Sequence, residues 1–89
     1  MNLEDVIFTD NLPVLDLHGF DRNYAVLKIN EFISDNKKMK NSICLIIHGI
    51  GNGVLKKETE KALKNNKDVI EQRLFYNNNG MTLVKIKIN

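Results

Sequence analysis

The sequence predicts an α/β fold: an α+β two-layer sandwich of order β-α-β-α-β-β, with two helices packed on a four-stranded mixed sheet. Three observations predict it. Apolar, strand-like segments alternate with segments of helical period, the last two strand-like segments flank an asparagine- and glycine-rich turn, and 89 residues suffice for one domain. Right-handed crossovers would make the first strands parallel, and the final hairpin would add an antiparallel strand. These patterns leave the order of strands in the sheet open.

The first half of the chain is expected to form an irregular lead-in, a strand and a helix. Residues 1–12 have no clear period, so the domain is predicted to span 13–89. A short strand is predicted over residues 14–18, because a proline precedes it at a position where strands tolerate proline. Asp21 is a suitable N-cap for the helix that follows, which should end within residues 35–38. The apolar stripe of this helix comprises Ala25, Ile29, Phe32 and Ile33.

The second half is expected to supply three strands and one helix. Residues 42–48 form a continuous apolar run typical of a central strand, and residues 54–65 are predicted to be helical. Strands over residues 69–76 and 81–88 would flank a turn at 77–80. The second helix is predicted to bury Leu55, Thr59, Ala62 and Leu63 and to expose Lys56, Lys57, Glu60, Lys61 and Lys64. The last strand should bury Val84, Ile86 and Ile88 on one face and solvate Lys85 and Lys87 on the other.

The composition is ordinary for a globular domain. Hydrophobic residues make up 43% and charged residues 27% of the chain, and the net charge of +2 permits a polyanionic partner without requiring one. The single cysteine, Cys44, has no internal disulfide partner and is predicted to be a buried hydrophobe. No segment has the length and apolar character of a membrane helix or a signal peptide, so we expect a cytoplasmic protein without membrane contact.

The most informative segment is His48-Gly49-Ile50-Gly51-Asn52-Gly53, which joins the predicted central strand to the second helix. The start of a helix has unpaired N–H groups and the positive end of the helix dipole, and both favour a bound anion such as phosphate. Glycines let the backbone take positive φ values and let a ligand approach the main chain. Gly49, Gly51 and Gly53 are therefore predicted to bind phosphate.

A second strand ends in the same dipeptide, at Asp16-Leu17-His18-Gly19. Asp16 and His18 lie two residues apart, so their side chains should point to the same side of a strand. Two predicted strands that end in His-Gly suggest one shared site, and open α/β sheets bind ligands at the carboxyl ends of their strands. A carboxylate and two imidazoles beside a phosphate cradle can support phosphodiester hydrolysis, with Asp16, His18 and His48 as candidate catalytic residues.

Structural interpretations of the same residues remain open. A single His-Gly at a strand end is often only a turn, Asp16 could cap a helix or a loop, and Gly-x-Gly-x-Gly without Gly-Lys-Ser/Thr is no Walker loop. Lys56, Lys57 and Arg22 stand near the two motifs and could bind phosphate, but each could equally serve solubility. For the aromatic side chains, packing is favoured over stacking on bases; these are Tyr24, Phe75 and Tyr76.

These motifs resemble those of the small MutS-related (Smr) domain. Leu15-Asp16-Leu17-His18-Gly19 is similar to the family's Leu-Asp-x-His motif, and His48-Gly49-Ile50-Gly51 is similar to its His-Gly-x-Gly motif. The resemblance extends from about residue 15 to the C-terminus. It implies the family fold, which is similar to the C-terminal domain of bacterial translation initiation factor three and agrees with the order of elements above.

The resemblance also implies nucleic-acid binding and, as in several members, metal-assisted nicking or endonucleolytic cleavage of DNA or RNA, with Mg²⁺ or Mn²⁺ as cofactor. One motif departs: where the family has Gly-Gly-x-Gly-x-Thr, this chain has Asn77-Asn78-Asn79-Gly80-Met81-Thr82. Side chains at two former glycine positions could narrow access to nucleic acid. A non-cleaving nucleic-acid-binding module and a protein-interaction domain therefore stay open as alternatives to a nuclease, and so does the oligomeric state.

Overall fold

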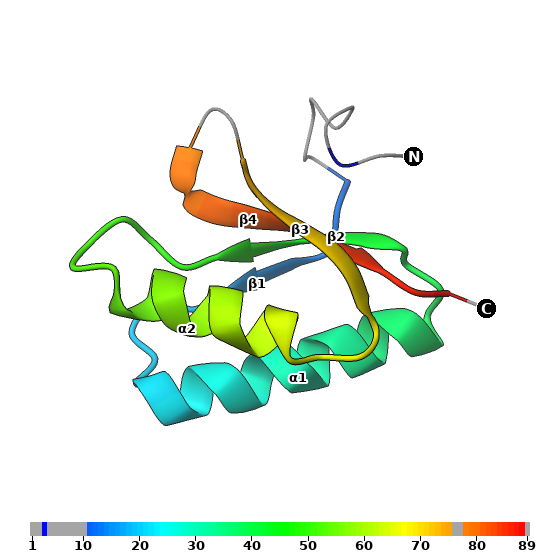
Figure 1. Cartoon of the computed structure of the whole chain (residues 1–89), viewed down its shortest axis with the longest axis horizontal. Coiled ribbons are helices and arrows are strands. Elements are labelled where there is room, and N and C mark those ends of the chain that lie inside the picture. Colours follow the sequence, from blue (N-terminus) through cyan, green and yellow to red (C-terminus); the bar gives the residue numbers. More distant parts are fainter. Residues whose placement is uncertain (1–2, 4–10, 76–77, 89) are drawn as a thin grey trace.

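The chain forms one four-stranded sheet with two helices on one of its faces (Figure 1). The computed structural model describes residue 3, residues 11–75 and residues 78–88. The elements follow in the order β1 (Val14–Asp16), α1 (Arg22–Lys38), β2 (Ile43–Ile47), α2 (Val54–Lys64), β3 (Val69–Phe75) and β4 (Asn78–Ile86). The predicted α+β fold and its order of elements are thereby confirmed.

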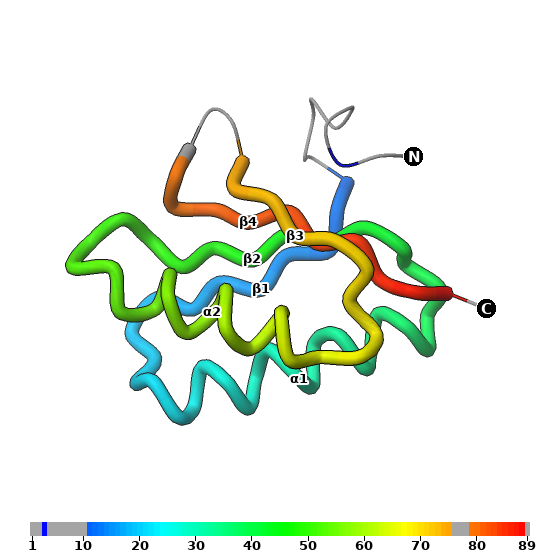
Figure 2. Tube along the Cα trace, viewed as in Figure 1, coloured from blue at the N-terminus to red at the C-terminus, as the bar shows by residue number. Residues whose placement is uncertain are grey.

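The strands lie in the spatial order β1-β2-β4-β3, which the sequence had left open. β1 and β2 are parallel, with Asp16 opposite Ile47, and β4 is antiparallel to both β2 and β3. The last strand therefore lies between β2 and β3, and the chain trace in Figure 2 shows β4 beside β2 although 30 residues separate their ends. This central position of β4 brings its residues against the end of β2.

The main core lies between the helices and the sheet. The Asp21 carboxylate accepts a hydrogen bond from the Tyr24 N–H at 2.8 Å, which confirms the predicted N-cap of α1. Cys44 is fully buried, and burial raises the pKa of its thiol to about 12, as expected of a small core residue. The buried side chains of this core are Leu17, Ala25, Ile29, Ile33, Cys44, Ile46, Ala62, Leu63, Val84 and Ile86.

A smaller apolar cluster lies on the opposite face of the sheet. It comprises Leu3, Leu45, Phe75 and Leu83, with Leu12, Ile43 and Met81 packed around it. The prediction that β4 has one solvated face is therefore only partly right, because Leu83 shares that face with Lys85 and is buried. Leu3, within the predicted irregular lead-in, is 1% exposed; residues 1–2 and 4–10 lie outside the described part of the chain.

Several predicted boundaries are wrong. β2 spans Ile43–Ile47 instead of residues 42–48, α2 ends at Lys64 instead of residue 65, and β4 ends at Ile86 instead of residue 88. The predicted end of β3, residue 76, lies outside the described part of the chain. Two of the differences have a clear cause. β1 ends at Asp16 instead of residue 18, because the Leu17 and Phe20 backbones already form a turn, with Phe20 N–H donating to Leu17 O at 3.0 Å. β4 begins at Asn78, so the predicted turn at 77–80 is mostly strand. The reason is the pairing of Gly80, whose carbonyl accepts hydrogen bonds from the end of β2. Within the described residues, neither helix has the length and apolar character needed to cross a membrane.

Candidate functional site

The parallel pairing of β1 and β2 brings the two His-Gly motifs to one edge of the sheet. Asp16 pairs with Ile47, and the Leu17 N–H donates to Ile47 O at 2.8 Å, so His18 and His48 each lie just beyond the end of neighbouring strands. α1 and α2 both begin at this edge (Figure 1). The sequence therefore placed the two motifs correctly, but the two imidazoles have different surroundings.

His48 is buried, with 7% of its surface exposed, and both ring nitrogens have partners within the chain. Its Nδ1 lies 3.1 Å from the Gly49 carbonyl oxygen, and its Nε2 lies 2.8 Å from Thr82 Oγ1. A carbonyl oxygen only accepts, so Nδ1 carries the proton and the neutral ring accepts the Thr82 hydroxyl proton at Nε2. This pair of bonds fixes both the tautomer and the orientation of the ring.

The pKa of His48 is lowered from its ordinary value of 6.5. Burial disfavours the charged imidazolium, the Gly49 carbonyl partly opposes this effect, and the positive charge of Lys56 adds to it. The ring is therefore neutral at pH 7, in agreement with the tautomer that its hydrogen bonds define.

The backbone of the same segment is tied to β4. His48 N–H and Gly49 N–H both donate to Gly80 O, at 2.9 and 3.0 Å. Gly80 and Thr82, the two residues that this chain keeps from the family's Gly-Gly-x-Gly-x-Thr motif, are thus the ones that hold His48 in place. Sequence reasoning missed Thr82 as a site residue, although its retention in that motif was a usable signal.

Asp16 and His18 are both exposed to solvent. Asp16 Oδ1 accepts a hydrogen bond at 2.9 Å from the backbone N–H of His18, and Gly19 follows with a φ of +80°. The carboxylate therefore caps the turn after β1, which is the structural role that the sequence left open for it. His18 therefore lies in this turn and not in β1, so the strand alternation predicted for Asp16 and His18 is wrong. The His18 side chain is exposed, and its imidazole is accessible to a ligand.

The glycine loop, residues 49–53, leads from His48 into α2. Gly49 and Gly53 have φ values of +78° and +83°, a conformation that other residues adopt only with strain. Gly51 has no such constraint, and a Cβ atom added there would meet no other atom within 4 Å. Gly51 therefore leaves space at the loop surface, while Gly49 and Gly53 make the turn possible.

The N-terminus of α2 offers donors to an anion. Gly53 is the N-cap and has no side chain to supply an acceptor, and the Asn52 side chain accepts only the Val54 N–H, at 3.1 Å. The first backbone bond of the helix runs from Lys57 N to Gly53 O, which leaves the N–H groups of Leu55 and Lys56 for a ligand. The first turn contains no acidic residue, so the helix dipole is not neutralised there.

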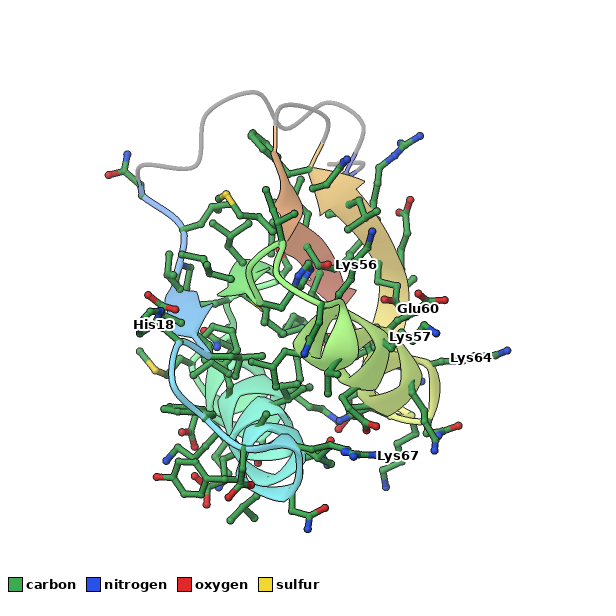
Figure 3. All side chains as sticks on the ribbon, turned by 90° about the vertical axis from the view of Figure 1, so that its left-hand side faces the viewer. His18, Lys56, Lys57, Glu60, Lys64 and Lys67 are labelled. Carbon is green, nitrogen blue, oxygen red and sulfur yellow. The ribbon has the colours of Figure 1, made fainter. Side chains whose placement is uncertain are left out.

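Basic side chains extend from this end along α2. Lys56 and Lys57 lie in its first turn, and Figure 3 shows them with Lys64 along the helix, on the other side of this edge from His18. Lys61, which the sequence assigned with Lys64 to a solvated face, is exposed one helical turn after Lys57. Arg22 is exposed and lies 3.9 Å from Glu58, so its charge is shared with that carboxylate.

The residues at this edge do not by themselves make a metal centre. No three His, Cys, Asp or Glu side chains gather into a ligand set within the described residues. Asp16 already accepts one hydrogen bond, and both nitrogens of His48 are engaged. Mg²⁺ usually keeps several waters and binds through one or two carboxylates together with substrate phosphates, and Asp16 is the one carboxylate that the two motifs would offer it.

Comparison with known sequences gives one family. Residues 15–87 match the model of the Smr domain. The chain is 35% identical over 81 residues to the Endonuclease MutS2 of Alkaliphilus metalliredigens, an alignment that covers 88% of this chain and 10% of that protein. It is 33% identical over 78 residues to the Ribosome rescue factor SmrB of Buchnera aphidicola, covering 84% of this chain and 42% of the relative. The chain thus spans less than half the length of these relatives.

Solved structures show the same fold. The Smr domain of Thermus thermophilus MutS2 superposes with a TM-score of 0.83 at 23% identity, over 85% of this chain and 99% of that one. YdaL, a stand-alone small MutS-related protein from Escherichia coli, superposes with a TM-score of 0.79 at 18% identity, over 83% of this chain and 63% of that one. Both likenesses support the arrangement of strands and helices described above.

Proposed function

This chain belongs to the Smr domain family, and from that membership we propose that it binds nucleic acid at the carboxyl edge of β1 and β2 and cleaves a phosphodiester bond held there. The observation that carries the proposal is the glycine loop, which opens onto the unpaired N–H groups of Leu55 and Lys56. The names of the relatives point the same way, because one is an endonuclease and another a ribosome rescue factor.

Binding would combine backbone and side-chain donors. A phosphate oxygen accepts from the two free N–H groups at the start of α2, and Gly51 allows the sugar-phosphate chain to approach the loop. Lys56 and Lys57 add positive charge beside the same phosphate, with Gly49 and Gly53 shaping the turn. Arg22 contributes a weaker attraction, since Glu58 lies 3.9 Å from it.

For cleavage, the two histidines would have different roles. The exposed His18 takes the proton of an attacking water molecule as the new P–O bond forms, and returns it to the leaving oxygen as the old P–O bond breaks. Asp16 fixes the backbone at His18 through its 2.9 Å bond. His48 stays neutral and positions the glycine loop through Gly49 and Thr82. No part of this proposal passes through a metal ion; Mg²⁺ or Mn²⁺ dependence remains a prediction of the family resemblance.

Binding without cleavage is a second candidate. One observation favours it: both nitrogens of His48 are engaged, so this edge offers only one free imidazole for proton transfer. The two candidates share the phosphate site and differ only in turnover. Incubation of the purified protein with labelled single-stranded RNA, supercoiled DNA and branched DNA, each with Mg²⁺, Mn²⁺ or EDTA, separates them.

Salt dependence tests the binding that both candidates require. Phosphate contacts release counterions, so affinity should fall steeply with salt. Replacing Lys56 and Lys57 by glutamine should flatten the log–log salt slope by up to about two units. The matched control is Lys38→Gln with Lys40→Gln, an equal change of charge at the other end of α1, which should leave the slope nearly unchanged. Affinity that is indifferent to salt would contradict the proposal.

A further inference from the structure

A cavity of about 200 Å³ opens between α2 and the β3–β4 hairpin. It shares two residues with the site described above: Lys56 from the first turn of α2, and Thr82, whose hydroxyl is bonded to His48. The cavity therefore begins where the glycine loop ends. Its lining consists of Lys56, Glu60, Gln72, Arg73, Leu74 and Thr82.

The lining does not suit a second phosphate. Glu60, which Figure 3 shows beside Lys56 on α2, contributes a carboxylate that repels an anion. Leu74 adds an apolar wall, while the Lys56 ammonium brings hydrogen-bond donors. A flat, uncharged ring with both donor and acceptor groups along its edge matches this combination of side chains.

Two sides of the cavity are held in place by internal bonds. Gln72 Nε2 donates to the Glu60 backbone carbonyl at 3.0 Å, which ties β3 to α2 at the cavity lining. Thr82 donates its hydroxyl proton to His48 at 2.8 Å, which leaves the lone pairs of Oγ1 as acceptors. A cavity fixed in this way loses little conformational entropy when a ligand enters.

We propose that this cavity receives an unpaired guanine base, next to the phosphate that the glycine loop holds. The inference rests on the proposed function, because the same strand supplies both groups. Glu60 accepts hydrogen bonds from the N1–H and N2 amino groups of the base, and Lys56 donates to its carbonyl and ring acceptors. The base must be unpaired, since pairing would occupy the edge that Glu60 reads.

The test compares bases within one strand. Labelled octaribonucleotides of uridine carry at one central position guanine, inosine or uracil, and binding is measured by fluorescence anisotropy in EDTA. We expect the guanine strand to bind about tenfold more tightly than the uracil strand, as for one good base contact. Inosine lacks the N2 amino group, so its strand should bind with intermediate affinity. Annealing the guanine strand to its complement should abolish the advantage.

Glu60→Gln supplies the protein control. It removes the carboxylate without changing its size, so the ratio of guanine to uracil affinity should fall close to one, even if the lost negative charge strengthens binding to every strand. Glu58→Gln makes the same charge change on α2 beside Arg22, away from the cavity lining, and should keep the full ratio.

The outcomes separate the two proposals. Equal affinity for guanine and uracil, with binding still dependent on salt and on Lys56 and Lys57, would overturn the guanine site and leave the proposed function intact. A preference that Glu60→Gln does not reduce would also overturn it. Failure to bind any strand would overturn the proposed function and this inference together.

Discussion

His18 and His48 are each followed by glycine and lie just beyond the ends of two neighbouring parallel strands, yet their surroundings differ. The β1 end lies at the edge of the sheet, where Asp16 caps a turn and His18 is exposed. The β2 end lies inside the sheet, where β4 covers it and supplies Gly80 and Thr82 as partners. Position within the sheet, more than the local motif, therefore decides whether such a histidine is exposed to solvent or buried as part of the structure.

A pair of alanine variants tests the different roles of the two histidines most directly. His18→Ala should lower the rate of phosphodiester cleavage by ~10²–10⁴-fold, the usual contribution of a general acid or base. Its affinity and thermal stability should stay near those of the wild type, because the side chain is exposed. His48→Ala should instead lower stability as well as turnover, since it empties a buried position and leaves the Thr82 hydroxyl unpaired.

Cleavage rates and urea midpoints measured on the same preparations check this pair. If His18→Ala kept full activity and His48→Ala kept full stability, the roles assigned to the two histidines would be wrong. Cleavage that survived both substitutions together, in protein free of contaminating nuclease, would show that other residues carry out the reaction.

The hydrogen bond between Thr82 of β4 and His48 allows a second test of the structural role of His48. Thr82→Val keeps the shape of the side chain but leaves the buried Nε2 of His48 without a donor, which should cost about 1–3 kcal/mol of unfolding free energy. Thr59→Val is the matched control. It removes a buried hydroxyl that donates to the Leu55 carbonyl, a group that also serves the helix, so the loss should be smaller. Chemical denaturation of both variants measures the difference, and equal losses would argue against a special role for Thr82.

Substitutions of Gly49 and Gly51 should differ in their effects: the first should lower stability, and the second should weaken nucleic-acid binding. Gly49→Ala places a side chain at a φ of +78° and should cost ~1–2 kcal/mol of stability. Gly51→Val places its Cβ where no other atom lies within 4 Å, so stability should stay nearly unchanged, yet the side chain should weaken nucleic-acid binding by filling the space beside the helix N-terminus. Thermal denaturation and anisotropy measure the two effects. Unchanged binding in Gly51→Val would place the phosphate elsewhere.

Local patterns were enough to predict the order of elements, the Asp21 cap and the edge of the sheet where both motifs meet. They could not predict the burial of His48, because this depends on β4 pairing with β2 across a long stretch of chain. The partnership with Thr82 was missed for the same reason. The turn at 77–80 was misplaced because asparagine and glycine favour turns locally, while the pairing of Gly80 with the end of β2 extends the strand.

The smallest expected effect is a pH dependence that belongs to His48. Its pKa is lowered in the folded chain, chiefly by burial, so below pH 6.5 the unfolded chain binds more protons than the folded one. The stability linked to this group is therefore complete above about pH 6.5 and is lost as the pH falls through the folded-state pKa. Urea midpoints between pH 5 and 8 should decline on the acidic side, and the decline should be smaller in His48→Gln, which cannot titrate. An identical decline in both proteins would show that His48 is not the buried neutral imidazole that its bonds to Gly49 and Thr82 describe.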